Sequence, residues 1–215
     1  MATLIRGLID RAQTILQDAA GTRWPRPELL GWFNDGRREL AVHRPTEFSK
    51  RVPLTLAAGS LQQLPAGAFL LQRININLRS TAPRVAGRTV TAVERRILDA
   101  MHPGWEDTTV FPETPEVLHY CYDEAEPLVF GIFPPNDGTG SVELTACFEP
   151  GDESSEDTPI GVRDVFANAL LDYMLFRAFD KDSDHPGNAE RSAKHYAAFA
   201  AAVGISGMAQ TGVEA

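Results

Sequence analysis

The most apolar helical pattern in the chain covers residues 162–179. Its apolar side chains recur at intervals of three and four residues, which places them on one side of a helix. Leu171, Leu175 and Phe176 extend this apolar surface more than half way round the helix, beyond what one packing partner covers. We therefore expect this helix to lie centrally, with other helices around it.

Two further helices are predicted near the N-terminus. The first covers about residues 3–20 and is followed by Gly21, a residue typical of the position after a helix. The second starts near Pro27, whose missing N–H is not needed in a first turn, and stops before Pro45. Gly36, in the middle of the second helix, has two interpretations: a tolerated surface glycine, or a point where a neighbouring backbone packs closely.

A last helix is predicted after Pro186, with Asp184 as the residue that caps it. Small residues dominate its predicted packing face, which consists of Ala189, Ala193, Tyr196, Ala197, Ala200 and Val203. Because alanine lets helices approach closely, this face suits either packing within the chain or a contact between subunits.

Between about residues 47 and 150 the hydrophobic period changes to two, and proline and glycine become frequent, which predicts β structure. Residues 52–56 and 61–64 are expected to form a hairpin. Residues 74–79 are expected to form a half-buried strand with Asn75, Asn77 and Arg79 on its polar face. The other predicted elements are a short helix at 93–101, strands at 117–121, 128–133 and 142–148, a strand end at Pro134-Pro135, and a turn at 136–140.

These elements predict an α+β fold in which N- and C-terminal helical hairpins form a four-helix bundle with an inserted small antiparallel β domain. The acidic segment GDESSEDT, residues 151–158, contains no apolar residue and reads as an exposed connector. The expected boundaries are 1–46 for the N-terminal helices, 47–158 for the β domain with the connector, 159–204 for the C-terminal helices, and 205–215 for a tail.

Composition narrows the functional classes. Hydrophobic residues make up 43% of the chain and charged residues 23%, an ordinary globular balance. The formal charge of −9 disfavours a protein that wraps nucleic acid, because phosphate binding needs clustered lysine and arginine. Cys121 and Cys147 are too few for a disulfide framework and are expected to be buried free thiols. No apolar run is long enough to span a bilayer, so a protein made and kept in the cytoplasm is expected.

The sequence contains almost no motif typical of a catalytic, cofactor or metal site. The phosphate-loop, dinucleotide, zinc-protease and serine-hydrolase patterns are missing, and the five histidines have no ligand spacing. The run DKDSD, residues 180–184, copies the start of a calcium loop. It lacks the required glycine and glutamate, since His185 and Arg191 stand at those positions. We expect no enzyme, no cofactor and no metal site.

Several segments together carry a family resemblance: LLGWFNDGRRELAVHRP (29–45), LDAMHPGW (98–105), and FGIFPP, VELTACFEP, VFANALLDYMLFRAFDKD and NAERSAKHYAAFAAAVG between residues 130 and 204. They resemble the adaptor proteins of tailed bacteriophages, in particular the head-to-tail adaptors of short-tailed phages. That family also has an α-helical bundle around a β insertion.

The resemblance implies a structural protein of the virion neck, assembled in the host cytoplasm, with no role in a membrane. Its copies are expected to form a ring of twelve below the portal, leaving a channel that DNA crosses without specific binding. The implied partners are other copies of the chain, the portal protein, and tail nozzle or tail fibre proteins.

Two groups of residues are candidates for this function. The acidic residues Asp152, Glu153, Glu156 and Asp157 are hypothesised to face the channel. Contacts with the portal or a neighbouring subunit are hypothesised for Ile205, Met208 and Val213 of the tail and for Ala193, Tyr196 and Ala197 of the last helix. The alternative for the tail is that it folds back onto its own helices.

This function has three alternatives. A neck or head-completion protein of a long-tailed phage belongs to the same structural class. A cytoplasmic interaction protein would use the alanine-rich helix face to bind a partner helix. An enzyme acting on cell wall or nucleic acid would need a cleft with perturbed acids or histidines, and the sequence shows no such constellation.

Overall fold

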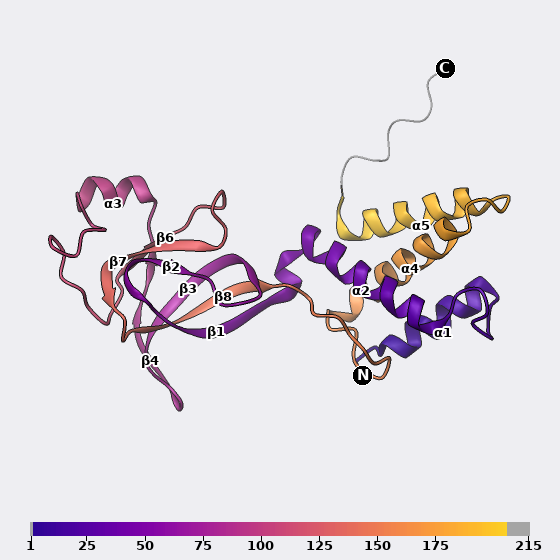
Figure 1. Ribbon diagram of the computed structural model, residues 1–215, viewed down its shortest axis with the longest axis horizontal. Helices are drawn as coiled ribbons and strands as arrows, with labels where there is room; N and C mark the ends of the chain where they lie inside the picture. The colour runs from indigo at the N-terminus through magenta and orange to yellow at the C-terminus, as the bar shows by residue number, and fades with distance from the viewer. Residues whose placement is uncertain (1, 206–215) are drawn as a thin grey trace, which may run out of the picture. The chain divides into compact units, whose positions relative to one another are not determined.

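The computed structural model describes residues 2–205 and confirms a mixed α+β chain. The chain divides into two compact units. The helical unit combines the chain up to Phe48 with the chain from Pro150 onward, and the β unit is Ser49–Glu149. The acidic segment 151–158 therefore belongs to the helical unit. Figure 1 shows the helices of the first unit and the strands of the second.

Within residues 2–205, four α-helices build the helical unit. They are α1 (Ile5–Leu16), α2 (Arg26–His43), α4 (Ala167–Lys181) and α5 (Asn188–Val203), with short 3-10 turns η1 (Pro45–Phe48) and η2 (Asp164–Phe166). Each carries apolar residues at helical spacing, and the most amphipathic, α1, buries Ile5, Leu8, Ile9, Ala12 and Leu16 on one side.

Helix α4 lies centrally, as its apolar pattern predicts, because it packs against α1, α2 and α5. Leu171 and Leu175 are buried, and Phe176 contacts the rings of Tyr173 and Tyr196. The residues that extend the apolar surface are therefore covered within the helical unit. The description of these helices as a regular four-helix bundle stays a prediction.

Three predictions about helix ends are wrong. Helix α4 begins at Ala167 rather than at residue 162, and the side chain of Val165 in η2 is exposed. Helix α1 ends at Leu16 because Gln17 takes a left-handed conformation (φ 55°) and Asp18 then accepts hydrogen bonds from three following backbone N–H groups. Asp184 does not cap α5, whose N-cap is Gly187 with no side-chain hydrogen bond.

The β unit contains two four-stranded sheets and the helix α3 (Arg95–Met101). The strands are β1 (Ser49–Thr55), β2 (Ala58–Gln63), β3 (Ala68–Thr81), β4 (Arg84–Thr89), β5 (Thr91–Ala92), β6 (His119–Cys121), β7 (Val129–Asp137) and β8 (Ser141–Phe148). One sheet has the order β1-β8-β3-β4 and the other β2-β7-β6-β5.

Both sheets contribute to one core. It includes Leu71 and Ile74 of β3, Leu144 of β8, and Phe130 and Ile132 of β7. A smaller cluster lies under α3, where Leu98 and Trp105 pack on Cys121 and Phe133. The predicted antiparallel character needs one correction, because β5 and β6 pair in parallel.

The predicted hairpin of residues 52–56 and 61–64 is wrong. Strand β1 pairs with β8, and β2 pairs with β7 in the other sheet, so the chain crosses between sheets after Leu56. The side chain of Gln62 fixes this crossing by hydrogen bonds to the backbone N–H and C=O of Ala57. Pro134-Pro135 does not end a strand, since β7 continues to Asp137 before the chain returns to the first sheet.

Asn77 is buried instead of lying on a polar outer face. Register shifts around Ile76 alter the alternation of β3 and turn this side chain inward. Its amide accepts a hydrogen bond from the N–H of Val117 (2.8 Å) and donates to the C=O of Val117 (2.7 Å) and of Arg88 (3.0 Å). A buried amide thus replaces strand pairing for these backbone groups.

Cys121 and Cys147 are both buried and form no disulfide, as predicted. Burial raises the pKa of both thiols. A search of residues 2–205 finds no helix with the length and apolar character of a membrane span.

Candidate functional site

The acidic segment 151–158 is held against α1 and α2 by arginines. All four acids predicted to face a channel form ion pairs within the helical unit. The pairs are Asp152 with Arg38, Glu153 with Arg37 (3.1 Å), Glu156 with Arg26 (2.5 Å) and Asp157 with Arg6 (2.6 Å). We call this set the arginine clasp. The segment is therefore a bound strap rather than a free exposed connector.

Arg37 is the most enclosed member of the clasp. Its side chain is 7% exposed, and one guanidinium nitrogen donates to the backbone C=O of Gly151 and to the Glu153 carboxylate, both at 3.1 Å. Its guanidinium also lies 5.8 Å from the centre of the Phe33 ring. Asn34, one turn away, exchanges two hydrogen bonds with the backbone of Glu153. Asn34 and Arg37, one turn apart on α2, thus bind both the backbone and a side chain of the strap.

Arg26 connects the strap with α1. It donates to both oxygens of Glu156 and also to Asp10 and Gln13 of α1. The hydrogen bonds to Glu156 raise the pKa of the Arg26 guanidinium. The sequence shows the acids and the arginines separately but not their pairing, because the partners lie more than a hundred residues apart.

The contact residues predicted on α5 have two different environments. Ala193 and Ala197 are exposed, whereas Tyr196 is half-buried with its ring 5.0 Å from that of Phe176. The buried residues of α5 are Asn188, Ser192, Phe199, Ala200 and Val203. The predicted packing face is therefore confirmed for Ala200 and Val203 and wrong for Ala189, Ala193 and Ala197, which are exposed. The large Phe199 sets the buried side of α5, which leaves Ala193 and Ala197 on the exposed side.

Ile205 is the last described residue of the predicted tail contacts. It is half-buried, and its N–H donates to the C=O of Ala200 (2.8 Å) just after α5 ends. Met208 and Val213 lie outside the described residues.

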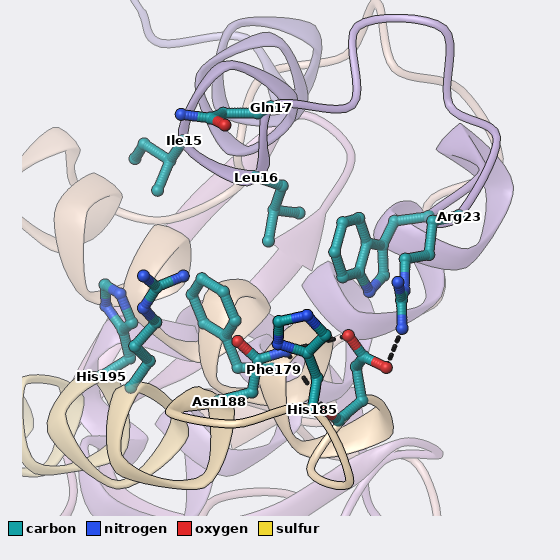
Figure 2. A pocket seen from close by; sticks show the side chains of 11 residues that line it. Ile15, Leu16, Gln17, Arg23, Phe179, His185, Asn188 and His195 are labelled. Carbon is teal, nitrogen blue, oxygen red and sulfur yellow. Dashed lines mark hydrogen bonds and ion pairs between the residues drawn. The ribbon is translucent and has the colours of Figure 1, made fainter.

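A hollow of about 650 Å³ lies where the ends of α1, α4 and α5 meet the loop after α1. Figure 2 shows its walls, which include Leu16, Arg23, Phe179, His185 and His195. Three of its polar residues bind one another. The Asp182 carboxylate pairs with Arg23 and accepts a hydrogen bond from Asn188 (2.9 Å).

Two further side chains of α5, Arg191 and His195, line this hollow. Arg191 and His195 both lie on the ring of Phe179, with separations of 5.6 and 5.7 Å. His195 also pairs with Asp172 of α4 at 2.9 Å. These contacts connect α5 to the C-terminal half of α4. Asp182, which belongs to the calcium-like run, thus serves an ion pair and a hydrogen bond. Within the described part of the chain no group of three or more metal-ligating side chains occurs.

Comparison with known proteins assigns the family. No curated protein matches the chain. A family model described as SU10 adaptor protein matches residues 3–214, which include the helical and the β unit. The match agrees with the resemblance found in the sequence, and the family is one of structural proteins of phages. The chain therefore belongs to the SU10 adaptor protein family, a family of phage head-to-tail adaptors.

Proposed function

We propose that this adaptor forms a ring in the virion neck, docks below the portal and joins the capsid to the tail. The observation that carries the proposal is the family match over residues 3–214. A closed ring of identical copies needs a heterologous interface, in which one side of each subunit meets a different side of the next. The resemblance to adaptors of short-tailed phages suggests twelve copies, with tail nozzle or tail fibre proteins below.

The ring encloses a channel for DNA in this proposal. The formal charge of −9 for each copy favours a wall that repels phosphate and so lets DNA slide. That Asp152, Glu153, Glu156 and Asp157 face this channel stays a prediction. Because each of them is paired with an arginine, we expect these four acids to add little to the repulsion.

Docking to the portal is proposed for the end of the chain. The supporting features are the exposed Ala193 and Ala197 of α5 and the position of Ile205 directly after that helix. Met208 and Val213 would supply further apolar contacts. Deletion from Ser206 onward should leave the thermal unfolding of the adaptor unchanged and weaken its binding to portal at least about tenfold. Unchanged binding would rule out this role for the tail.

The mass of the adaptor with and without its portal tests the function. We expect a ring on the portal, visible by negative-stain microscopy and by native mass spectrometry. A chain that ignores the portal and binds another protein through α5 would support the interaction-protein alternative. A ring that binds only to an already assembled connector would support a head-completion protein at another level of the neck.

A further inference from the structure

The sheet β2-β7-β6-β5 has two open edges, one at each end. In the described chain, β2 pairs only with β7, and β5 pairs only with β6. An open edge strand presents backbone N–H and C=O groups that recruit another strand. The two edges differ in sequence and length, so they suit a contact between unlike sides of two copies.

An exposed leucine marks the β2 edge. Leu61 is 67% exposed, an unusual position for a large apolar side chain in a strand. Its neighbours Ser60 and Gln62 are buried, so Leu61 points away from the core between the sheets. The leucine therefore stands on the outer face of this sheet with no core residue covering it.

An apolar hollow marks the β5 edge. It measures about 370 Å³, and we call it the α3 hollow. Its walls are Ala92, Val93, Glu94, Ile97, Leu98, Met101, His102 and His119. Met101, at its rim, is 63% exposed. The ring of His102, one of these walls, stacks on the ring of Phe133, with 4.3 Å between the ring centroids.

The strand register places the leucine and the hollow on the same face. Leu61 is directly opposite Gly131, and Gly131 is opposite Cys121. Directly paired residues share a face, and so do residues two apart in a strand, which brings His119 to the face of Leu61. His119 is a wall of the α3 hollow. If the sheet continues from one copy to the next, the leucine at one edge meets the hollow at the other.

We infer that the β2 edge of one copy lies along the β5 edge of the next and inserts Leu61 into the α3 hollow. This interface rests on the proposed ring, whose side-by-side contact it names. Strand β5 is only two residues long, so the backbone supplies few hydrogen bonds. The insertion of Leu61 and the covering of Met101 then provide most of the contact by removing apolar surface from water.

A cysteine pair tests the geometry directly. The double variant L61C/M101C, assembled on the portal and oxidised, should give a ladder of covalent oligomers on a non-reducing gel. The single variants L61C and M101C are the controls and should give no ladder. The native Cys121 and Cys147 are buried and stay in place. A ladder requires position 61 of one copy to meet position 101 of the next, whereas a dimer from a single variant would show a two-fold contact and overturn the inference.

Charge substitutions measure the strength of the contact. L61E and M101E should each weaken ring formation at least about tenfold, because each places a carboxylate in an apolar contact. The matched control is V42E, since Val42 in α2 is similarly exposed, at 71%. Circular dichroism and thermal unfolding of all three variants verify folding. If the unmodified chain forms no ring on the portal, the proposed function fails. If that ring forms, but L61E rings form equally well and no ladder appears, only this inference fails.

Discussion

Gly36 of α2 lies directly against the ring of Tyr173 of α4. A Cβ atom at position 36 would stand 3.0 Å from Cδ1 and 3.2 Å from Cγ of the tyrosine. Gly36 is buried, so it is not a surface glycine, and the close neighbour is a side chain rather than the backbone that the other interpretation expects. Gly31 in the same helix has nothing within 4 Å of the corresponding point. A side chain at position 31 would therefore affect only helix propensity, whereas one at position 36 would also disturb the contact between α2 and α4.

Substitution of these glycines should have opposite effects on stability. Gly31→Ala should raise the free energy of unfolding by about 0.5–1 kcal/mol, because alanine restricts the unfolded chain and favours helix. Gly36→Leu should lower it by about 1–3 kcal/mol, because the ring of Tyr173 must move. Urea unfolding followed by circular dichroism measures both. A stabilising Gly36→Leu would show that the helices separate at no cost.

Adjacent arginines of the clasp should differ in their contribution. Arg37→Ala should lower the free energy of unfolding by about 2–3 kcal/mol, because it leaves Glu153 and the C=O of Gly151 without their buried donor. Arg38→Ala should cost about 0.5 kcal/mol or less, because its side chain is 49% exposed and water screens its pair with Asp152. Equal losses in thermal unfolding would contradict the special role of Arg37.

The amide of Asn77 should be essential to the β unit. Asn77→Ala removes three hydrogen bonds and leaves the N–H of Val117 buried without a partner, so we expect a loss of about 2–4 kcal/mol. Asn75→Ala is the control, since Asn75 is half-buried and, among the described residues, its side chain bonds only the Thr145 hydroxyl; about 1 kcal/mol is expected. Chemical denaturation compares them, and a mild effect at Asn77 would mean that water replaces its amide.

The pair Arg84–Glu143 should give the stability a dependence on pH. The hydrogen bonds from Arg84 lower the pKa of the Glu143 carboxyl in the folded chain. The folded state then binds fewer protons than the unfolded state, so the pair stabilises above the unfolded pKa of about 4.3 and loses that effect as the pH falls. Glu143→Gln should therefore flatten the decline of stability below about pH 5.

Urea unfolding across a pH series checks this expectation. The exposed Glu126→Gln, in the loop before β7, is the control for loss of one negative charge. An unchanged pH profile in Glu143→Gln would assign the decline to other carboxyl groups.

The local patterns of the chain were sufficient for its helices but not for its strand pairing. Helix α4 follows from apolar residues at intervals of three and four, and its central place follows from the width of that apolar surface. The alternation in residues 52–64 identifies β1 and β2 as strands. It contains nothing that tells a hairpin from a crossing between sheets, because that depends on β7 and β8 some eighty residues later.

The candidate site was predictable only where the decisive contact is local. The acids of residues 151–158 are visible as a charged run, yet their partners Arg26 and Arg38 are 130 and 114 residues away. On α5 the prediction is wrong for Ala189, Ala193 and Ala197, because alanine fits a helix contact as well as a surface and Phe199 determines which side is buried. The sequence signal that could have identified the buried face of α5 is its large apolar residue, Phe199.

The first and last strands of the β unit pair with each other, so the two ends of this insertion lie side by side. Ser49 of β1 is directly opposite Cys147 of β8, so the points where the chain enters and leaves the insertion are about 5 Å apart. An insertion with adjacent ends can be exchanged for another of different length while the flanking helices keep their packing. Replacement of residues 49–149 would then leave the chain of the helical unit unchanged.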